Sequence, residues 1–440
     1  MSRSGRAPLR EVWRNREVRG LLLAQVCSDA GDQVARIALT LLVYERSGSL
    51  LAAAATLAVS FIPGVVAKAM LGSLADRYPR RTVMVVCDLL RALVIGFLAL
   101  LAGPGTSIAP LLALLLVSEL ATGPFASART ALYADILRDP SEFTAAQAAG
   151  RMVNLGMQVG GFVVGGIVIQ LIGAREVLAL DALTFLVSYA LVRTQVRARP
   201  AADETGTSVR RLLADVKLGA REIFRDPLKR PIVLVSWIST LYFSAPEAVA
   251  VGYHPGQSAT TSGLLLAAAP AGSFVGAAVL SRVRLPDQVP LIVPMACLSC
   301  LTLFATSIDP EPAVAFGLWF VAGSMTAFVI TIIASVVQLT LPARRGRVVG
   351  MAFAGFNAAS AVAYLVMGWA AESLGAARAV SLAGVVGLAS MLIFRLVWRQ
   401  DRLVNRLDAL SAPAVISLPE DERSSSQVGP IPDPEPADAS

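Results

Sequence analysis

The sequence has little charge, few cysteines and almost no histidine. Only 16% of its 440 residues are charged, whereas soluble domains carry about 25%. His254 is the only histidine, the four cysteines all lie in apolar stretches, and no Gly-x-x-x-x-Gly-Lys-Ser/Thr motif occurs. These absences exclude a histidine proton relay and argue against a metal centre, a disulfide framework and ATP as an energy source. We therefore expect no cofactor, no bound metal and no enzymatic activity.

Apolar segments of membrane-spanning length fill most of the chain. Hydrophobic residues make up 55% of it, and its mean hydropathy is +0.65. A span needs about 20 mostly apolar residues. The sequence predicts twelve spans, at 18–44, 49–71, 82–102, 107–128, 144–171, 175–193, 230–252, 259–281, 288–308, 312–341, 347–371 and 375–397. The first is expected to be a retained helix rather than a signal peptide, because it carries Asp29, Asp32 and Arg36.

The net charge of +7 is explained by the membrane topology. With the N-terminus inside, 31 of the 38 Lys and Arg residues lie in segments on the inner side, and the outer loops hold three. An excess of Lys and Arg on the cytoplasmic side sets the orientation of membrane proteins. We expect a multi-pass protein of the cell membrane with both termini in the cytoplasm, and no nucleic-acid partner.

A polar linker divides the twelve spans into two sets of six. Residues 1–193 are predicted to form an N-terminal bundle, 194–229 a cytoplasmic linker, and 230–398 a C-terminal bundle. The linker contains an amphipathic helix over 208–224, which we expect on the inner membrane surface; the alternative is a solvated helix. Residues 399–440 should be a cytoplasmic tail, mostly disordered because its end is rich in proline, serine and acids.

The two halves carry traces of a duplication. The glycine pair Gly166 and Gly173 recurs as Gly368 and Gly375, 202 residues later, and both pairs are followed by alanine. Gly276 follows Gly72 by 204 residues. The sequence therefore predicts an all-α integral membrane protein whose twelve transmembrane helices form two pseudo-symmetric six-helix bundles.

The loop between the second and third spans carries a family signature. It reads Gly72-Ser-Leu-Ala-Asp76-Arg77-Tyr-Pro-Arg80-Arg81, and it resembles the G-x-L-A-D-R-x-G-R-R loop of major facilitator superfamily transporters. Further motifs resemble the macrolide-efflux and enterobactin-exporter branch, at 31–33, 88–92, 128–132, 180–185, 338–342 and 346–348. The resemblance implies the fold of this superfamily and a role in transport.

The fifth span departs from the pattern of family exporters. Such exporters often carry G-P-x-x-G-G there, whereas this chain has Gly161-Phe162-Val163-Val164-Gly165-Gly166. The three glycines still permit close helix packing. The missing proline weakens the case for proton antiport.

The resemblance also implies a conformational latch. Asp76 would accept hydrogen bonds at the start of the eleventh span, where the helix dipole favours an anion. Arg77, Arg80 and Arg81 would pair with acids of the inner face such as Asp135. This latch would hold the outward-open state; the alternative is that the loop is basic only for topology.

Ionisable groups at membrane depth are candidate functional residues. Asp29, Asp32 and Arg36 share one face of the first span, and in this superfamily the first and fourth spans line the cavity. We expect Asp32 or Glu119 to carry a proton, with Asp32 and Arg36 as a switchable ion pair. The alternative is a fixed pair that orients the helix or attracts substrate, and Asp29 is expected to be structural.

These features predict a secondary active exporter of a hydrophobic or amphipathic small molecule, driven by proton antiport. Its cavity would be lined by the first, fourth, seventh and tenth spans, with Asn154, Tyr242, Phe243 and Glu247 as candidate substrate contacts. The expected partners are the small molecule, protons and the lipid bilayer, and the protein is expected to be a monomer. Two alternatives stay open: a dedicated siderophore or metabolite exporter, and a non-transporting membrane sensor or scaffold.

Overall fold

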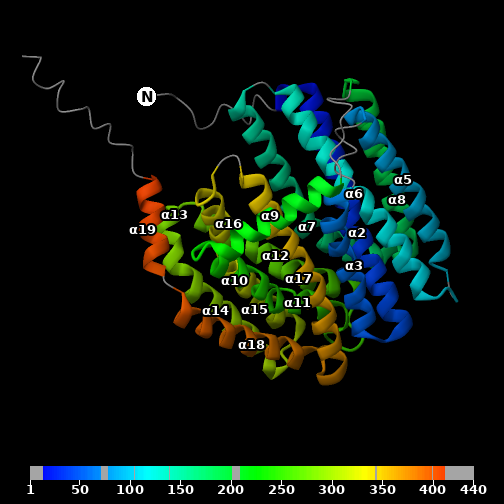
Figure 1. Cartoon of the computed structure of the whole chain (residues 1–440). Helices are drawn as coiled ribbons and strands as arrows, with labels where there is room; N and C mark the ends of the chain where they lie inside the picture. The colour runs from blue at the N-terminus through cyan, green and yellow to red at the C-terminus, as the bar shows by residue number, and fades with distance from the viewer. Residues whose placement is uncertain are drawn as a thin grey trace, which may run out of the picture.

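The computed structural model describes residues 13–70, 78–103, 105–137, 139–200, 209–341, 344–398 and 400–411. The regular structure within these ranges is helical throughout (Figure 1). Nine of the helices found there are long and apolar enough to cross a membrane. The chain is therefore an all-helical membrane protein, as its hydropathy predicts.

The N-terminal half consists of six long helices. They are α2 (Arg16–Ser47), α3 (Leu50–Met70), α5 (Arg80–Leu101), α6 (Ile108–Ile136), α7 (Pro140–Ile172) and α8 (Ala174–Gln195). Local signals set their ends. The Asn15 side chain accepts hydrogen bonds from the backbone of Glu17 and Val18 at the start of α2, and Gly48 ends that helix with a φ of 64°. An N-cap side chain and a left-handed glycine are common helix boundaries.

The C-terminal half has shorter helices because its seventh, ninth and tenth spans are divided into shorter elements. Its elements are α10 (Lys229–Phe243), α11 (Ala245–Val249), η1 (Ala250–Gly252), α12 (Ala259–Leu280), α13 (Leu285–Gln288), η2 (Val289–Leu291), α14 (Ile292–Phe304), η3 (Ala305–Ile308), α15 (Pro312–Met325), α16 (Phe328–Gln338), α17 (Arg345–Leu374) and α18 (Ala376–Val397). The seventh span breaks at Ser244, just before Pro246, where a proline removes a helix hydrogen bond. The tenth breaks at Thr326.

The two halves repeat one packing scheme. In the first half α2 packs against α7 and α8, α5 against α6 and α8, and α3 against α6. The second half has the same neighbours in the same order: α10 packs against α17 and α18, α14 against α15 and α18, and α12 against α15. This correspondence confirms the predicted pair of pseudo-symmetric bundles.

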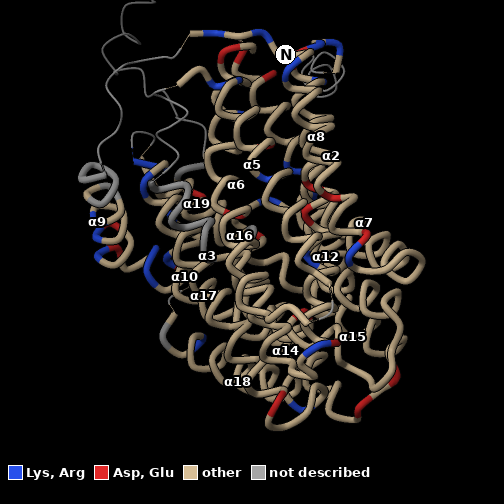
Figure 2. The backbone as a smooth tube through the Cα atoms, turned by 90° about the vertical axis from the view of Figure 1, so that its right-hand side faces the viewer, with Lys and Arg blue, Asp and Glu red and all other residues tan. Residues whose placement is uncertain are grey.

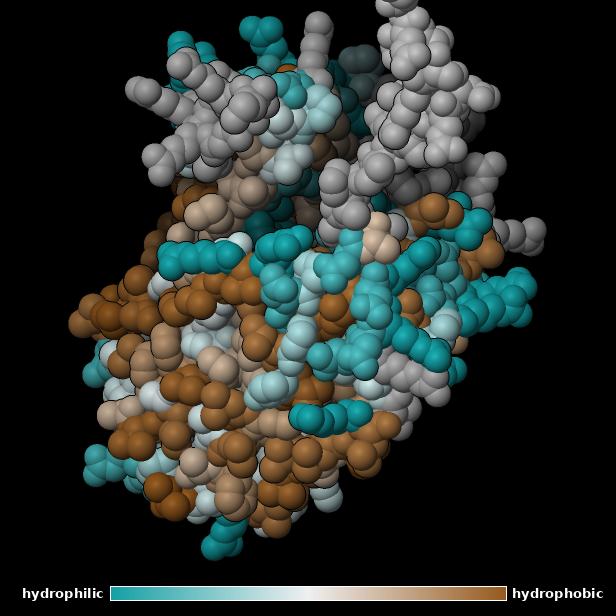
Figure 3. Space-filling view, turned by 90° about the vertical axis from the view of Figure 1, so that its left-hand side faces the viewer, coloured by the Kyte–Doolittle hydropathy of each residue, from teal (hydrophilic) through white to brown (hydrophobic). Residues whose placement is uncertain are grey.

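Charge distinguishes the two ends of the molecule. We call the end where α2 and α5 begin and α8 and α18 finish the basic end, and the other the opposite end. Figure 2 shows Lys and Arg gathered at the ends of the helices and on α9, with long tan stretches between. Figure 3 shows a broad hydrophobic surface below a hydrophilic band. Apolar side chains such as Leu301, Phe304 and Leu396 are exposed to the surroundings. Exposed apolar side chains of this kind suit contact with lipid.

Two amphipathic helices cover the C-terminal half near the basic end. α9 (Val209–Arg225) packs against α17 and α10; its Ile223 is fully buried, and its Phe224 ring meets Trp237 edge to face at 6.0 Å. The predicted linker helix thus exists and rests on protein along one face. α19 (Gln400–Ser411) packs against α13 and α16 with Leu403 buried. The predicted tail from 399 onward therefore begins with a packed helix, and 412–440 lie outside the described residues.

Candidate functional site: a cavity between the two halves

The two halves touch closely at the opposite end. A Cβ on Gly166 of α7 would lie 2.6 Å from the Ala259 carbonyl oxygen of α12, and one on Gly368 of α17 would lie 2.6 Å from the Ala54 side chain of α3. Only glycine permits such an approach. Of the three glycines predicted to pack helices, Gly166 thus faces the other half. Gly161 and Gly165 lie against α2 within their own half, where an added Cβ would lie 2.6 Å and 2.9 Å from its side chains.

Two side chains stabilise these contacts in the same way, by accepting hydrogen bonds from the other half. At the end of α17, the Glu372 carboxylate accepts hydrogen bonds from the Ser49 hydroxyl at 2.9 Å and the Leu51 backbone N–H at 3.1 Å. At the end of α7, the Gln170 amide oxygen accepts from the backbone N–H of Thr260 at 3.3 Å and from its hydroxyl. Each acceptor caps the first turn of a helix in the other half. The opposite end is therefore closed.

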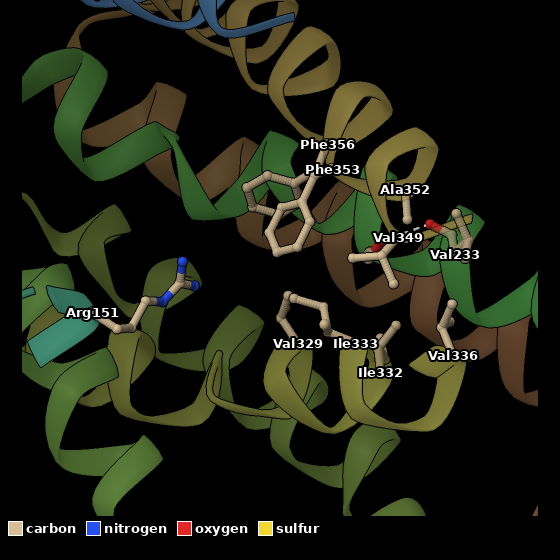
Figure 4. A pocket seen from close by; sticks show the side chains of 11 residues that line it. Arg151, Val233, Val329, Ile332, Ile333, Val336, Val349, Ala352, Phe353 and Phe356 are labelled. Atoms are coloured by element: carbon tan, nitrogen blue, oxygen red, sulfur yellow. Dashed lines mark hydrogen bonds between the residues drawn. The ribbon is translucent and has the colours of Figure 1, made fainter. Parts of the chain in front are cut away.

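A cavity lies on the side of these contacts that faces the basic end. Its C-terminal wall is apolar and lines a hollow of about 140 Å³. Figure 4 shows Arg151 of α7 on one side of this space, facing Phe353 and Phe356 of α17. The lining residues are Arg151, Val233, Ser236, Val329, Ile332, Ile333, Val336, Val349, Ala352, Phe353 and Phe356.

The N-terminal wall of the cavity is polar. Arg151 lines this surface as well, so the apolar and the polar surface adjoin each other at this residue. The wall consists of Gln25, Ser28, Asp29, Asp32, Arg91, Thr122, Phe125, Ala126, Arg129, Thr130, Tyr133, Gln147, Gly150, Arg151 and Asn154. The Asp29 carboxylate accepts hydrogen bonds from Gln25 at 3.0 Å and Asn154 at 3.3 Å. Asn154, a predicted substrate contact, thus lies in the wall.

Asp32 pairs with a residue of another helix than the sequence predicts. Its carboxylate forms an ion pair with Arg91 of α5, which also donates to the Ser28 hydroxyl at 3.0 Å. Arg36 lies instead 3.7 Å from Glu119 of α6 and donates to the Gln33 side chain at 3.2 Å. The predicted Asp32–Arg36 pair was wrong. Residues one turn apart on a helix can contact each other, but here both side chains pair with residues of neighbouring helices instead. The sequence does show Arg91 as a cation within an apolar span, where a charged side chain needs an anionic partner.

Three predicted substrate contacts lie away from the cavity walls. Tyr242 is fully buried against Gly387 of α18. Phe243, beside it, is half-buried and lines neither wall. Glu247 is 4% exposed and accepts a hydrogen bond from the Tyr364 hydroxyl at 2.6 Å. The sequence placed these residues on the correct span, but Tyr242 and Glu247 belong to the core of the second half.

Part of the predicted latch is visible at the basic end. Arg80 forms an ion pair with Asp135, and Arg81 donates to the Arg193 carbonyl oxygen. Both contacts join helices within the first half. Gly72, Asp76 and Arg77 lie outside the described residues, so the contact of this loop with α17 stays a prediction.

Comparison with known proteins decides the family. The family described as Major Facilitator Superfamily matches residues 21–309. The chain belongs to the major facilitator superfamily. It is 25% identical over 380 residues to the protein named multidrug efflux pump Tap of Mycolicibacterium fortuitum, covering 81% of this chain and 89% of that one.

Solved structures of the same fold agree with this assignment. The nucleoside transporter NupG superposes with a TM-score of 0.68 at 13% identity, over 87% of this chain and 99% of that one. A D-xylose-proton symporter gives 0.61 at 15% identity, over 89% and 98%. At such identities the likeness concerns the fold. Superfamily membership makes the protein a multi-pass membrane transporter of small molecules and not an enzyme.

Proposed function

We propose that the protein exports a hydrophobic or amphipathic small molecule by alternating access, driven by proton antiport. The observation that carries this proposal is the cavity with two unlike walls. A wall of valines, isoleucines and phenylalanines faces a wall of carboxylates, amides and guanidinium groups. An amphipathic molecule buries its apolar part on one and satisfies its polar part on the other. The similarity to a multidrug efflux pump supports the same conclusion.

Asp32 is the proposed proton carrier. It lines the cavity, its side chain is 21% exposed, and its partner Arg91 is almost fully buried. A proton on Asp32 removes the charge that holds Arg91, and its loss restores the pair. Glu119 does not line either wall, and its side chain lies against Arg36. Each proton that enters contributes about 2.3 kcal/mol per 100 mV of membrane potential.

The basic end is the proposed cytoplasmic end. The distribution of Lys and Arg supports this orientation. The structure would then represent an inward-open state, with its cavity accessible from the cytoplasm and its outer end held by Glu372 and Gln170. In that state the substrate would enter from the cytoplasm while the proton on Asp32 leaves.

A dedicated exporter of a siderophore or another metabolite is the second candidate. The motifs at 88–92 and 180–185 that resemble the macrolide-efflux and enterobactin-exporter branch favour it. The two candidates differ in substrate range, because a dedicated site rejects molecules that fail to match its polar groups. A panel of unrelated amphipathic dyes separates them.

Binding of ethidium, a fluorescent amphipathic cation, to the purified full chain tests the cavity. Phe353→Ala and Phe356→Ala each remove an aromatic face from the apolar wall. We expect each to weaken binding about two- to tenfold, since aromatic contacts contribute about 0.5–1.5 kcal/mol beyond burial. Phe304→Ala, on the exposed outer surface, is the matched control and should leave binding unchanged. Equal effects in all three variants, or no ethidium binding, would contradict a broad substrate cavity here.

A further inference from the structure

Behind the wall that carries Asp32 lies a group of buried carboxyls. Asp88 of α5 is 0% exposed and Asp181 of α8 is 2% exposed. Asp88 accepts a hydrogen bond from the Ser188 hydroxyl at 2.7 Å, and Asp181 accepts from Thr184 at 3.1 Å. In each, the second carboxyl oxygen is buried with no hydrogen-bond partner among the described residues. Neither residue lines the cavity.

Among the described residues, these two carboxyls have no cation of their own. The described ion pairs at this depth are Asp32 with Arg91 and Glu119 with Arg36. The charged groups near Asp88 are Arg91 and Asp32, and those near Asp181 are Asp32, Arg91 and Glu119. The Cys27 and Cys87 thiols also lie near Asp88. An unpaired carboxylate in a membrane interior is costly, so a proton neutralises it instead. Both Asp88 and Asp181 should therefore hold a proton while Arg91 is bound to Asp32.

The geometry brings Asp181 next to Asp32. A Cβ on Gly31, the residue before Asp32, would lie 2.0 Å from Asp181 Oδ1, so the Asp181 carboxyl rests directly on the α2 backbone. Arg91 lies over the ring of Phe185, one turn after Asp181 on α8, with its guanidinium carbon 4.0 Å from the ring centroid. The guanidinium thus sits between the helix that carries Asp32 and the helix that carries Asp181.

We propose that Asp181 is a second proton-binding site, and that Arg91 exchanges Asp32 for Asp181 as a proton passes between them. The proton leaves the Asp181 carboxyl and binds the Asp32 carboxylate, so the number of protons and the buried net charge stay constant. The positive charge of Arg91 moves in the opposite direction and pairs with the new carboxylate. Asp88 keeps its proton throughout. This inference rests on the proposed function, in which Asp32 carries the proton. Asp181 gives that proton a second binding position, which does not line the cavity.

Infrared spectroscopy of the purified full chain detects the protonated carboxyls directly. We expect the absorption of protonated carboxyl groups to persist in the wild type at neutral pH. Asp181→Asn and Asp88→Asn should each remove a separate part of it. This readout needs no transport, so it stands even if the pH gradient turns out not to drive export. If Asp181→Asn leaves the absorption unchanged, or the wild type shows none, the proposal is wrong.

Melting temperatures of a double-variant cycle test the exchange. Asp181→Asn replaces one neutral group by another and should melt like the wild type. Asp32→Asn should be tolerated because Arg91 turns to Asp181. The double variant leaves Arg91 without either partner and should lose far more stability than the two changes added together. Asp88→Asn is the matched control and should add to Asp32→Asn without coupling.

The remaining outcomes count against the proposal. Strong destabilisation or misfolding of Asp181→Asn alone would show an ionised Asp181 already paired in the ground state. Strictly additive effects of Asp32→Asn and Asp181→Asn would exclude the exchange. Coupling with Asp88→Asn in place of Asp181→Asn would transfer the role to Asp88 and overturn the assignment of Asp181.

Discussion

At the scale of single residues, buried polar groups of the second half have fixed partners. Glu247 and Tyr364 are both nearly inaccessible, and the hydroxyl donates to the carboxyl at 2.6 Å. The Tyr364 ring also packs on Phe61 of the first half, with 5.3 Å between the centroids. The pair therefore stabilises both the core of its own half and the contact between halves.

Tyr364→Phe should destabilise the protein while keeping the ring contact with Phe61. It leaves the buried Glu247 carboxyl without its donor, which typically costs about 1–3 kcal/mol. Tyr253→Phe is the matched control, since that hydroxyl donates to the Pro310 carbonyl oxygen, an uncharged acceptor. Thermal unfolding of the two purified variants should show the larger loss for Tyr364→Phe. A larger loss for Tyr253→Phe would contradict this assignment.

Residue pairing is also where prediction from sequence reached its limit. Asp32, Arg36, Arg91 and Glu119 were all recognisable as ionisable groups at membrane depth. Which acid meets which base depends on the relative rotation of α2, α5 and α6, and spacing along one helix carries no information about that. Phe353 and Phe356 were missed for a similar reason, because apolar residues that face the cavity look like those that face lipid.

At the scale of elements, the closed end is built from two equivalent helix caps. Glu372 lies four residues after Gly368, and Gln170 lies four residues after Gly166. The repeated glycine motif thus brings two helices together, and the residue one turn later caps the facing helix. The repeat was visible in the sequence, whereas the capping required knowing which helices face each other. The charged Glu372 cap should be the stronger of the two because the helix dipole favours an anion there.

Glu372→Ala should shift the protein toward states that are open at this end. Loss of a helix cap costs about 0.5–2 kcal/mol, which changes the ratio of two states about two- to thirtyfold. Spin labels at Gly105 and Asp309, exposed loop positions of the two halves at this end, report the opening as a longer distance. Ser373→Ala is the matched control, because the one bond of that hydroxyl among the described residues lies within its own helix, to the Trp369 carbonyl oxygen. An unchanged distance distribution in Glu372→Ala would show that the cap does not hold this end closed.

At the scale of the whole molecule, hydropathy and repetition were sufficient to predict the fold. Twelve apolar segments, a polar linker and two matching glycine patterns specify two six-helix bundles, and the packing scheme repeats between the halves. Sequence alone missed the breaks at Ser244 and Thr326, and it missed the burial of Tyr242 and Glu247. Orientation and the direction of transport depend on the membrane itself, so they stay proposals that rest on the basic end.

Transport into reconstituted vesicles under an imposed pH gradient tests the central claim most directly. With ethidium as the probe and one proton exchanged per cation, antiport is electroneutral, and a gradient of one pH unit supports up to about a tenfold accumulation. The account predicts that the wild type accumulates ethidium against its concentration gradient. Asp32→Asn should only equilibrate it, provided that the variant inserts and folds normally. Wild-type transport that is insensitive to the pH gradient would contradict proton antiport, and retained uphill transport by a well-folded Asp32→Asn would contradict Asp32 as the carrier.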